Sequence, residues 1–245
     1  MSVLVNQQIK AKPMSTLSKI IKWIVILSFP FLLGFGTVRT IIASDYPAFE
    51  YPRIAPDAYG WSAEERLALG NATLDYIQRP EPAEEVIYLL KDMRLPEDQA
   101  TPVYNESEIG HMIDVKILFD GIGRVLRGLM VIVPVGLASL FFINKTEFYE
   151  TVYKGGWATV ILLASIAIFI LVGWTVFFTL FHELLFPPGT WTFYYTDSLI
   201  RLFPEKFWFD VGAIISIGTL LEGVIVMFIG RYLVRSNAST KPQKS

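Results

Sequence analysis

Two histidines, His111 and His182, are the residues of this chain best suited to chemistry, and its 245 residues include no cysteine. Histidine is the side chain whose ordinary pKa lies closest to neutral pH, so it is the main group here that can exchange protons near pH 7. Both histidines fall just outside long apolar segments, at ends that face the same side if those segments cross a membrane. Together they form a candidate catalytic pair, in which one imidazole takes a proton and another donates one.

The first histidine belongs to a group of three regularly spaced polar residues. Glu108, His111 and Asp114 lie three residues apart, so on a helix their side chains share one face. A carboxylate beside an imidazole fixes its tautomer and stabilises its protonated form. The spacing predicts that Asp114 or Glu108 orients His111, and a solvated acidic face is the alternative interpretation.

The second histidine ends the third apolar segment and precedes an aromatic strip. After His182 come a Pro-Pro-Gly turn at 187–189 and a run that includes Trp191, Tyr194 and Asp197. Tryptophan and tyrosine favour the membrane–water boundary, so an ordinary aromatic belt accounts for these rings. It does not account for a histidine with an adjacent glutamate, and we expect this segment to line a lipid-facing pocket.

Other polar residues near the apolar segments are open to two interpretations each. Arg124 and Arg127 stand before the second segment, where they can meet a lipid phosphate or an ester carbonyl, or serve as snorkelling anchors. Glu222 lies within the last segment, and we favour a structural tie over a proton relay.

The chain lacks the motifs of several function classes. Two histidines and a carboxylate can in principle hold zinc, but their spacing matches no compact metal motif. There is no phosphate-cradling glycine loop and no nucleophile elbow. The net charge of −2 is uninformative about nucleic acid, but no basic cluster resembles a nucleic-acid footprint, so we expect no nucleic-acid partner. The sequence therefore predicts no metal and no cofactor.

The composition places the chain among membrane proteins, because 53% of its residues are hydrophobic and these gather in long runs. A helix needs about 20 apolar residues to cross the hydrocarbon core. Four runs meet this length, at 20–43, 125–143, 157–181 and 211–230. The first run is longer than the apolar part of a typical signal peptide, and we expect it to be retained as an anchor. The sequence predicts an all-α membrane protein with four transmembrane helices.

Basic residues near the spans indicate which side faces the cytoplasm. They gather in the N-terminal segment, in the link 144–156 and in the C-terminal tail, and include Lys10, Lys12, Lys241 and Lys244. The segment 44–120 holds sixteen acidic and six basic residues, a net charge of −10. We therefore expect both termini in the cytoplasm and this acidic segment outside.

A small, mainly helical extracytoplasmic cap is predicted between the first and second spans. Ser62 and Glu65 have the spacing of a capping box, which predicts a helix over 63–78 with Leu67, Leu74 and Ile77 along its buried face. Prolines bound a second, short helix over 83–93. The predicted segments are a cytoplasmic N-terminus (1–19), span 1 (20–43), the cap (44–124), span 2 (125–143), a cytoplasmic loop (144–156), span 3 (157–181), an extracytoplasmic aromatic loop (182–210), span 4 (211–230) and a cytoplasmic tail (231–245).

Two motifs carry a resemblance to a known family. The first consists of Glu108, His111, Met112, Asp114 and Val115. The second consists of Phe181, His182, Phe186, Pro187, Gly189, Trp191, Phe193 and Asp197, and continues through Phe203, Pro204 and Glu205 to Phe207. The chain resembles the lipoprotein intramolecular transacylases, a bacterial family of four-span membrane proteins. It departs from the family pattern at Pro188 and at Tyr194 and Tyr195, where more polar, turn-forming residues are expected.

The resemblance implies a particular reaction in the bacterial cytoplasmic membrane, with the active site at the outer leaflet. Such enzymes move the sn-2 acyl chain of a diacylglyceryl-modified lipoprotein from its first cysteine's glyceryl group to the α-amine of that cysteine. The product is an N-acyl lyso-form lipoprotein, and no cofactor or separate phospholipid donor is needed. The implied partners are such lipoproteins and membrane lipid.

This reaction assigns roles to the candidate residues. An α-amine has a pKa of about 7.7–8.0 and must lose a proton before it attacks, and the leaving glyceryl oxygen must receive one. We expect His111, oriented by Asp114 or Glu108, to act as base and His182 as acid, or the reverse. The expected substrate-binding residues are Glu108, Arg124, Gly189, Trp191, Tyr194 and Asp197. The alternatives are a membrane lipid ester hydrolase, a non-enzymatic partner or sensor, and a transporter dependent on Glu222.

Overall fold

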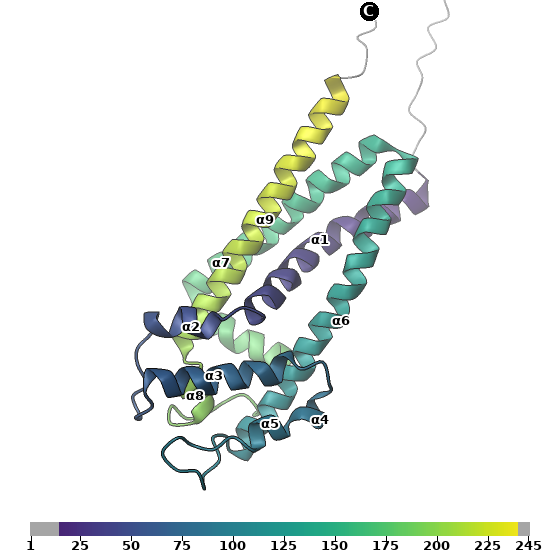
Figure 1. Cartoon of the computed structure of the whole chain (residues 1–245). Coiled ribbons are helices and arrows are strands. Elements are labelled where there is room, and N and C mark those ends of the chain that lie inside the picture. The colour runs from purple at the N-terminus through teal and green to yellow at the C-terminus, as the bar shows by residue number, and fades with distance from the viewer. Residues whose placement is uncertain (1–14, 240–245) are drawn as a thin grey trace, which may run out of the picture.

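The structure is a computed structural model that describes residues 15–239, and every regular element in that range is helical. Four long helices form a slanted bundle with short helices gathered at one end (Figure 1). The long helices are α1 (Thr16–Ile42), α6 (Glu106–Ile143), α7 (Lys145–Leu185) and α9 (Glu205–Ser239). Each is long and apolar enough to cross a membrane by length and composition. The prediction of an all-α membrane protein with four spans is confirmed.

The orientation prediction rests partly on residues that lie outside the described range, namely Lys10, Lys12, Lys241 and Lys244. The assignment of segments to the two sides of the membrane therefore stays a prediction.

Two of the long helices extend well beyond their apolar runs. α6 begins at Glu106, so the first histidine motif and the second span belong to one continuous helix. The link predicted over 144–156 is also helical, because Asn144 is the single residue between α6 and α7. The Asn144 side chain accepts a hydrogen bond from the Thr146 N–H at 3.0 Å and so caps α7. A sharp reversal at one residue therefore replaces the predicted loop.

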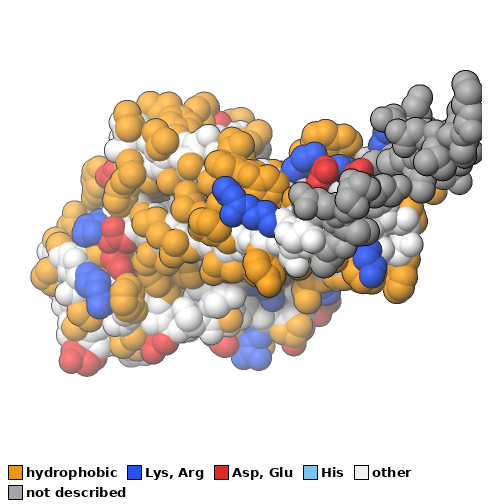
Figure 2. Space-filling model, turned by 90° about the horizontal axis from the view of Figure 1, so that it is seen from above, with side chains coloured by type: hydrophobic (Ala, Val, Ile, Leu, Met, Phe, Trp, Pro, Cys, Tyr) orange, Lys and Arg blue, Asp and Glu red, His pale blue; other side chains and the backbone are white. Residues whose placement is uncertain are grey.

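Glycines allow α7 and α9 to cross closely. A Cβ at Gly156 would collide with the backbone of Met227, and a Cβ at Gly230 would collide with the backbone of Tyr153. Small residues let helix backbones approach within a membrane, where van der Waals contact rather than water release drives helix association. The apolar side chains that remain on the outer faces cover much of the surface in Figure 2, as expected of a lipid-facing bundle.

The cap consists of short helices from two parts of the chain. Between α1 and α6 lie α2 (Tyr46–Glu50), the 3-10 turn η1 (Tyr51–Arg53), α3 (Ala63–Gln78), α4 (Ala83–Val86) and α5 (Tyr88–Lys91), and α8 (Ser198–Leu202) lies between α7 and α9. The helix predicted over 83–93 is in fact two short helices, α4 and α5, separated at Ile87.

Helix α3 has the predicted bounds and the predicted capping box. Ser62 accepts a hydrogen bond from the Glu65 N–H, and Glu65 accepts one from the Ser62 N–H. Its buried face differs from the prediction. Ile77 is buried as predicted, but Leu67 and Leu74 are half-buried, and Leu69 and Tyr76 are buried instead. Leu69, Tyr76 and Ile77 belong to one core with residues of α5, α6 and α8, so these neighbouring helices decide which face of α3 is buried.

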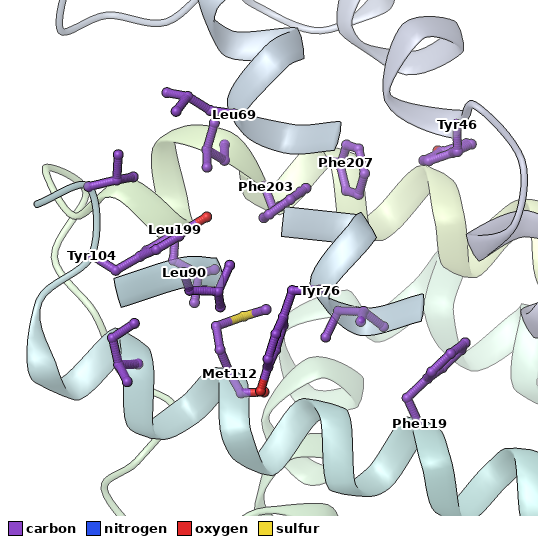
Figure 3. Close-up of a cluster of buried hydrophobic side chains, with 14 of the residues drawn as sticks. Tyr46, Leu69, Tyr76, Leu90, Tyr104, Met112, Phe119, Leu199, Phe203 and Phe207 are labelled. Atoms are coloured by element: carbon purple, nitrogen blue, oxygen red, sulfur yellow. The ribbon is translucent and has the colours of Figure 1, made fainter. Parts of the chain in front are cut away.

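One apolar core joins the cap to the start of α6. Figure 3 shows side chains from several helices meeting there, among them Tyr76, Leu90, Met112, Leu199 and Phe203. Because Met112 neighbours His111 on α6, this core fixes the backbone that carries the first histidine.

An ion pair holds α8 against the cap. Arg201 of α8 binds Asp57 through two hydrogen bonds of 3.1 and 2.8 Å, and its guanidinium lies 3.4 Å from the centre of the Trp61 ring. Both partners are nearly buried, so the pair is shielded from water and salt. The aromatic loop between α7 and α8 is therefore anchored at its far end.

Candidate active site

His111 lies in the second turn of α6, within the cap and before the apolar run that begins at residue 125. Its side chain is 7% exposed. The ring contacts two phenylalanines of the aromatic loop, with centroid distances of 4.9 Å to Phe186 and 5.4 Å to Phe193. The loop thus closes over the first histidine.

His182 lies in the last turn of α7 and is half-buried. Its Nδ1 lies 2.7 Å from the carbonyl oxygen of Phe178, one helical turn earlier. A carbonyl can only accept, so in the neutral ring Nδ1 carries the proton and Nε2 carries the lone pair. The backbone thereby fixes a tautomer that can act as a base at Nε2.

The two histidine rings lie together. Their centroids are 6.3 Å apart and the ring planes differ by 25°. Trp191 flanks His182, and the centroids of these two rings are 5.1 Å apart. An aromatic enclosure around two imidazoles excludes water and leaves a polar centre in apolar surroundings.

Burial sets the protonation state of His111. Removal from water lowers the pKa of His111 to about 4, with a smaller contribution from the charge of His182. The His111 Nδ1 is buried and has no hydrogen-bond partner among the described residues. His111 is therefore neutral at physiological pH, with a buried polar atom that the folded chain itself does not satisfy.

Glu108 does not orient His111, contrary to one of the two alternatives of the prediction. Its carboxylate accepts the Asn105 N–H at 2.8 Å as part of the α6 capping box, and the Leu199 N–H at 2.7 Å. Burial raises the pKa of Glu108, and these two backbone hydrogen bonds lower it in part. Both oxygens thus join the start of α6 to α8, which places Glu108 to position the loop. Its predicted role in substrate binding stays a prediction.

Asp114 does not orient His111 either. It is half-buried, and none of the hydrogen bonds among residues 15–239 joins it to the imidazole. Helical spacing put the two side chains on one face, but the His111 ring packs against the aromatic loop instead. The predicted orienting carboxylate is therefore wrong for both residues.

Arg124 lies away from the histidines. It is thirteen residues beyond His111 on the same helix, which corresponds to about 20 Å along the axis. It lines a cavity with Arg39 and Arg127 at the end of α1 that adjoins the cap. The structure therefore separates it from the other predicted site residues.

The aromatic loop contributes unequally to the site. Gly189 has a φ of 82°, a value that favours glycine, in a turn closed by a hydrogen bond from the Thr190 N–H to the Pro187 carbonyl. Tyr194 is 80% exposed, and among the described residues no ring contact joins it to either histidine. Asp197 accepts the Tyr194 N–H at 2.8 Å and lies 3.4 Å from the Asn105 amide, so it shapes the loop.

Three phenylalanines of the site were not predicted as site residues. Phe186 and Phe193 cover His111, and Phe178 supplies the carbonyl that fixes the tautomer of His182. Phe186 and Phe193 belong to the second motif of the family resemblance, which was the available signal.

Glu222 of α9 is tied to one neighbouring span, α1. Thr37 of α1 donates to the Glu222 carboxylate at 3.3 Å, and Thr219 donates to Thr37 at 3.1 Å. This is the structural role favoured from the sequence. Within residues 15–239 no group of three metal-ligating side chains is close enough to hold an ion.

The fold and the paired histidines define an integral membrane protein with a candidate acid–base site under a helical cap. The chain belongs to the lipoprotein intramolecular transacylase family, since residues 12–208 match the family described as lipoprotein intramolecular transacylase Lit.

The fold is similar to that of solved structures, and a further protein is similar to this chain along most of its length. The in meso structure of the membrane integral lipoprotein intramolecular transacylase Lit from Bacillus cereus is 20% identical, with a TM-score of 0.74 over 91% of this chain and 99% of that one. A variant of it with a histidine replaced by alanine has a TM-score of 0.68, covering 91% of this chain and 96% of the variant. An uncharacterized protein of Aquifex aeolicus is 28% identical over 86% of this chain and 94% of its own length.

Proposed function

We propose that this chain moves the sn-2 acyl chain of a diacylglyceryl-cysteine lipoprotein to the α-amine of the same cysteine. The observation that carries the proposal is the pair of imidazoles 6.3 Å apart in an aromatic enclosure, in a member of the transacylase family. Donor ester and acceptor amine belong to one substrate, so holding them in a near-attack geometry supplies much of the rate.

The two rings suit different parts of the reaction. The amine nitrogen, once deprotonated from its ammonium form, attacks the ester carbonyl, and a C–N bond forms as the C–O bond to glycerol breaks. After the attack, Nε2 of His182 takes the extra proton from the attacking nitrogen and delivers it to the leaving glyceryl oxygen. His182 suits this task because the Phe178 carbonyl holds its Nδ1 proton.

His111 suits stabilisation of the developing oxyanion. Its low pKa keeps it neutral, so it retains one N–H and adds no charge before reaction. Trp191 and the backbone around Gly189 are the further donors that we place near the oxyanion, and the surrounding phenylalanines contact the acyl chains. Compared with the first of the two orders considered from the sequence, the base role passes from His111 to His182, because the fixed tautomer belongs to His182.

We further propose that the active site faces the outer leaflet of the cytoplasmic membrane, with both termini in the cytoplasm. The net charge of −10 over 44–120 and the basic residues of the opposite ends support this orientation.

A reconstituted assay tests the activity. Purified chain in neutral detergent is given a synthetic diacylglyceryl-cysteine peptide whose sn-1 and sn-2 chains differ in length, mixed with an isotope-labelled copy. We expect N-acylation by the sn-2 chain alone, with no exchange of label between copies. Release of free fatty acid without N-acylation would instead identify an ester hydrolase.

Matched variants assign the activity to the histidines. His111→Gln and His182→Gln are expected to lose most activity, whereas the exposed neighbour variant Glu183→Gln is expected to retain it. Full activity in both histidine variants would contradict the proposed site.

A further inference from the structure

Three arginines gather at the junction of α1, α6 and the cap, away from the histidines. A Cβ on Gly123 of α6 would lie 3.4 Å from Nη1 of Arg39 and 3.6 Å from Nη1 of Arg127. These two guanidinium nitrogens are therefore no more than 7.0 Å apart, the sum of those distances. A Cβ on Gly121 would lie 3.8 Å from Nη2 of Arg124. The absence of a side chain at Gly123 leaves space in which the guanidinium groups of Arg39 and Arg127 converge, and that of Arg124 lies beside Gly121.

The arginines line a cavity of about 460 Å³. Its remaining walls come from the turn between α3 and α4 and from α6, and include Arg79, Pro80, Pro82, Ala83, Glu84 and Asp120. The cavity therefore lies between the ends of two spans and the base of the cap.

The positive charges in this cavity are not neutralised by the chain. Among residues 15–239, Arg39, Arg124 and Arg127 form no ion pair. Asp120 instead pairs with the buried Lys116 at 3.3 Å. Arg79 pairs with Asp75, and Glu84 is exposed at the rim. Like charges this close repel each other, so the arrangement favours an anion between them.

Simpler explanations account for each arginine but not for their convergence. Arg39 lies in the last turn of α1, where a cation suits the helix dipole, and it stacks 4.4 Å from the centre of the Phe119 ring. Arg124 and Arg127 can snorkel singly toward a membrane surface. Neither effect directs guanidinium groups from two helices toward the space above one glycine.

The position and chemistry of the cavity indicate its ligand. Arg39 lies three residues before the end of α1, and the apolar run of α6 begins at residue 125. The cavity is thus level with the ends of the spans, where lipid headgroups lie. The guanidinium fork matches the oxygens of a phosphate, and arginine is the residue best suited to hold one.

We propose that this cavity binds the phosphate of a membrane glycerophospholipid, with its acyl chains along the apolar faces of α1 and α6. Exposed side chains such as Phe31 and Met130 provide that apolar surface. This site is separate from the histidines and does not depend on the proposed activity, because the diacylglyceryl group of a lipoprotein carries no phosphate. The phospholipid is a bound ligand here and not a reactant.

Native mass spectrometry of the purified full-length chain in neutral detergent tests the proposal. The probes are dioleoylphosphatidylglycerol, dioleoylglycerol with the same chains but no phosphate, and inorganic phosphate. We expect the phospholipid to bind at one copy per chain, at least tenfold more tightly than dioleoylglycerol. Equimolar inorganic phosphate is expected not to displace it.

Variants locate the binding. The triple variant Arg39→Gln, Arg124→Gln, Arg127→Gln is expected to weaken phospholipid binding at least tenfold. A control with Arg231→Gln and Arg235→Gln removes arginines that line a separate hollow on α9, and is expected to leave binding unchanged. Because Arg127 is exposed, Arg127→Gln alone leaves packing intact and is expected to weaken binding about threefold or more.

Three results would overturn the proposal. Equal binding of phospholipid and dioleoylglycerol would show that the phosphate is not recognised. Displacement by equimolar inorganic phosphate would show a free-anion site rather than a lipid site. Unchanged binding in a folded triple variant, or in Arg127→Gln if the triple variant does not fold, would show that these arginines do not hold the phosphate.

Discussion

Replacing Glu108 separates positioning of the aromatic loop from chemistry at the histidines. The Glu108 carboxylate is 1% exposed and accepts two backbone N–H groups, from Asn105 at 2.8 Å and from Leu199 at 2.7 Å. Hydrogen bonds to a charged group contribute about 1.5–3 kcal/mol each, and a buried donor left unpaired adds a cost. Glu108→Ala is therefore expected to lower the free energy of unfolding by about 3 kcal/mol or more, and Glu108→Gln by about 1–2 kcal/mol.

The same change is expected to affect turnover through loop position. The Leu199 contact joins α8 to α6, and the loop before α8 carries the rings that cover His111. For a chain of this size a loss of 3 kcal/mol lowers Tm by about 6–12 °C. Below that transition we expect Glu108→Ala to lower kcat with an unchanged pH profile, and Glu108→Gln to restore most of it.

Thermal unfolding in detergent and single-turnover acyl transfer measure the two effects. Glu106→Gln is the matched control, because Glu106 lies in the same helical turn but is exposed. If Glu108→Ala matched Glu106→Gln in both Tm and kcat, the positioning role would be refuted. A shifted pH profile in Glu108→Gln would instead make Glu108 part of the proton chemistry.

Three further predictions concern pH, helix packing and the buried acid. The pKa of His111 is about 4, against about 6.5 in an unfolded chain, so the folded state loses up to about 3 kcal/mol of stability as pH falls from 6.5 to 4. The Tm of the unaltered chain should therefore fall over that pH range more steeply than the Tm of His111→Gln. Equal dependence of Tm on pH in the two proteins would contradict the burial argument. Gly156→Leu should prevent the close approach of α7 and α9, so that the purified variant is no longer monodisperse in size-exclusion chromatography. Gly128→Leu should be tolerated, because no atom lies within 4 Å of a Cβ at that position. A folded, monodisperse Gly156→Leu chain would refute the packing. Glu222→Gln keeps an acceptor for Thr37 and should retain acyl transfer within a fewfold, and a severe loss of activity would support a proton relay instead.

Local signals made parts of the fold predictable from the sequence. Four apolar runs of membrane length correspond to α1, α6, α7 and α9 because the requirement to cross a bilayer depends on length and composition alone. The capping box at Ser62 and Glu65 fixed the start of α3 in the same local way. The meeting of His111 and His182 was expected from their placement at equivalent ends of two spans, and the 6.3 Å separation agrees with it.

Features that depend on tertiary packing were not predictable. The spacing of Glu108, His111 and Asp114 placed them on one face, but could not show that α8 would take the carboxylate of Glu108. The tautomer of His182 depends on the carbonyl of Phe178, and a backbone acceptor has no signature in the sequence. The arginine cavity brings together residues of α1 and α6 that are some 85 positions apart in the sequence, so neither segment alone predicts it.

Mass spectrometry of lipoproteins made in living cells tests the central claim most directly. The chain is expressed in bacteria lacking their own N-acylation enzymes, and N-terminal lipopeptides are fragmented, because the diacyl substrate and the lyso-form product have the same mass. We expect fragments with one acyl chain on the cysteine nitrogen and one on the glyceryl group, in cells with the unaltered chain but not with His111→Gln or His182→Gln. Lipopeptides that retain both acyl chains on the glyceryl group, in cells where the unaltered chain is present in the membrane, would contradict the account.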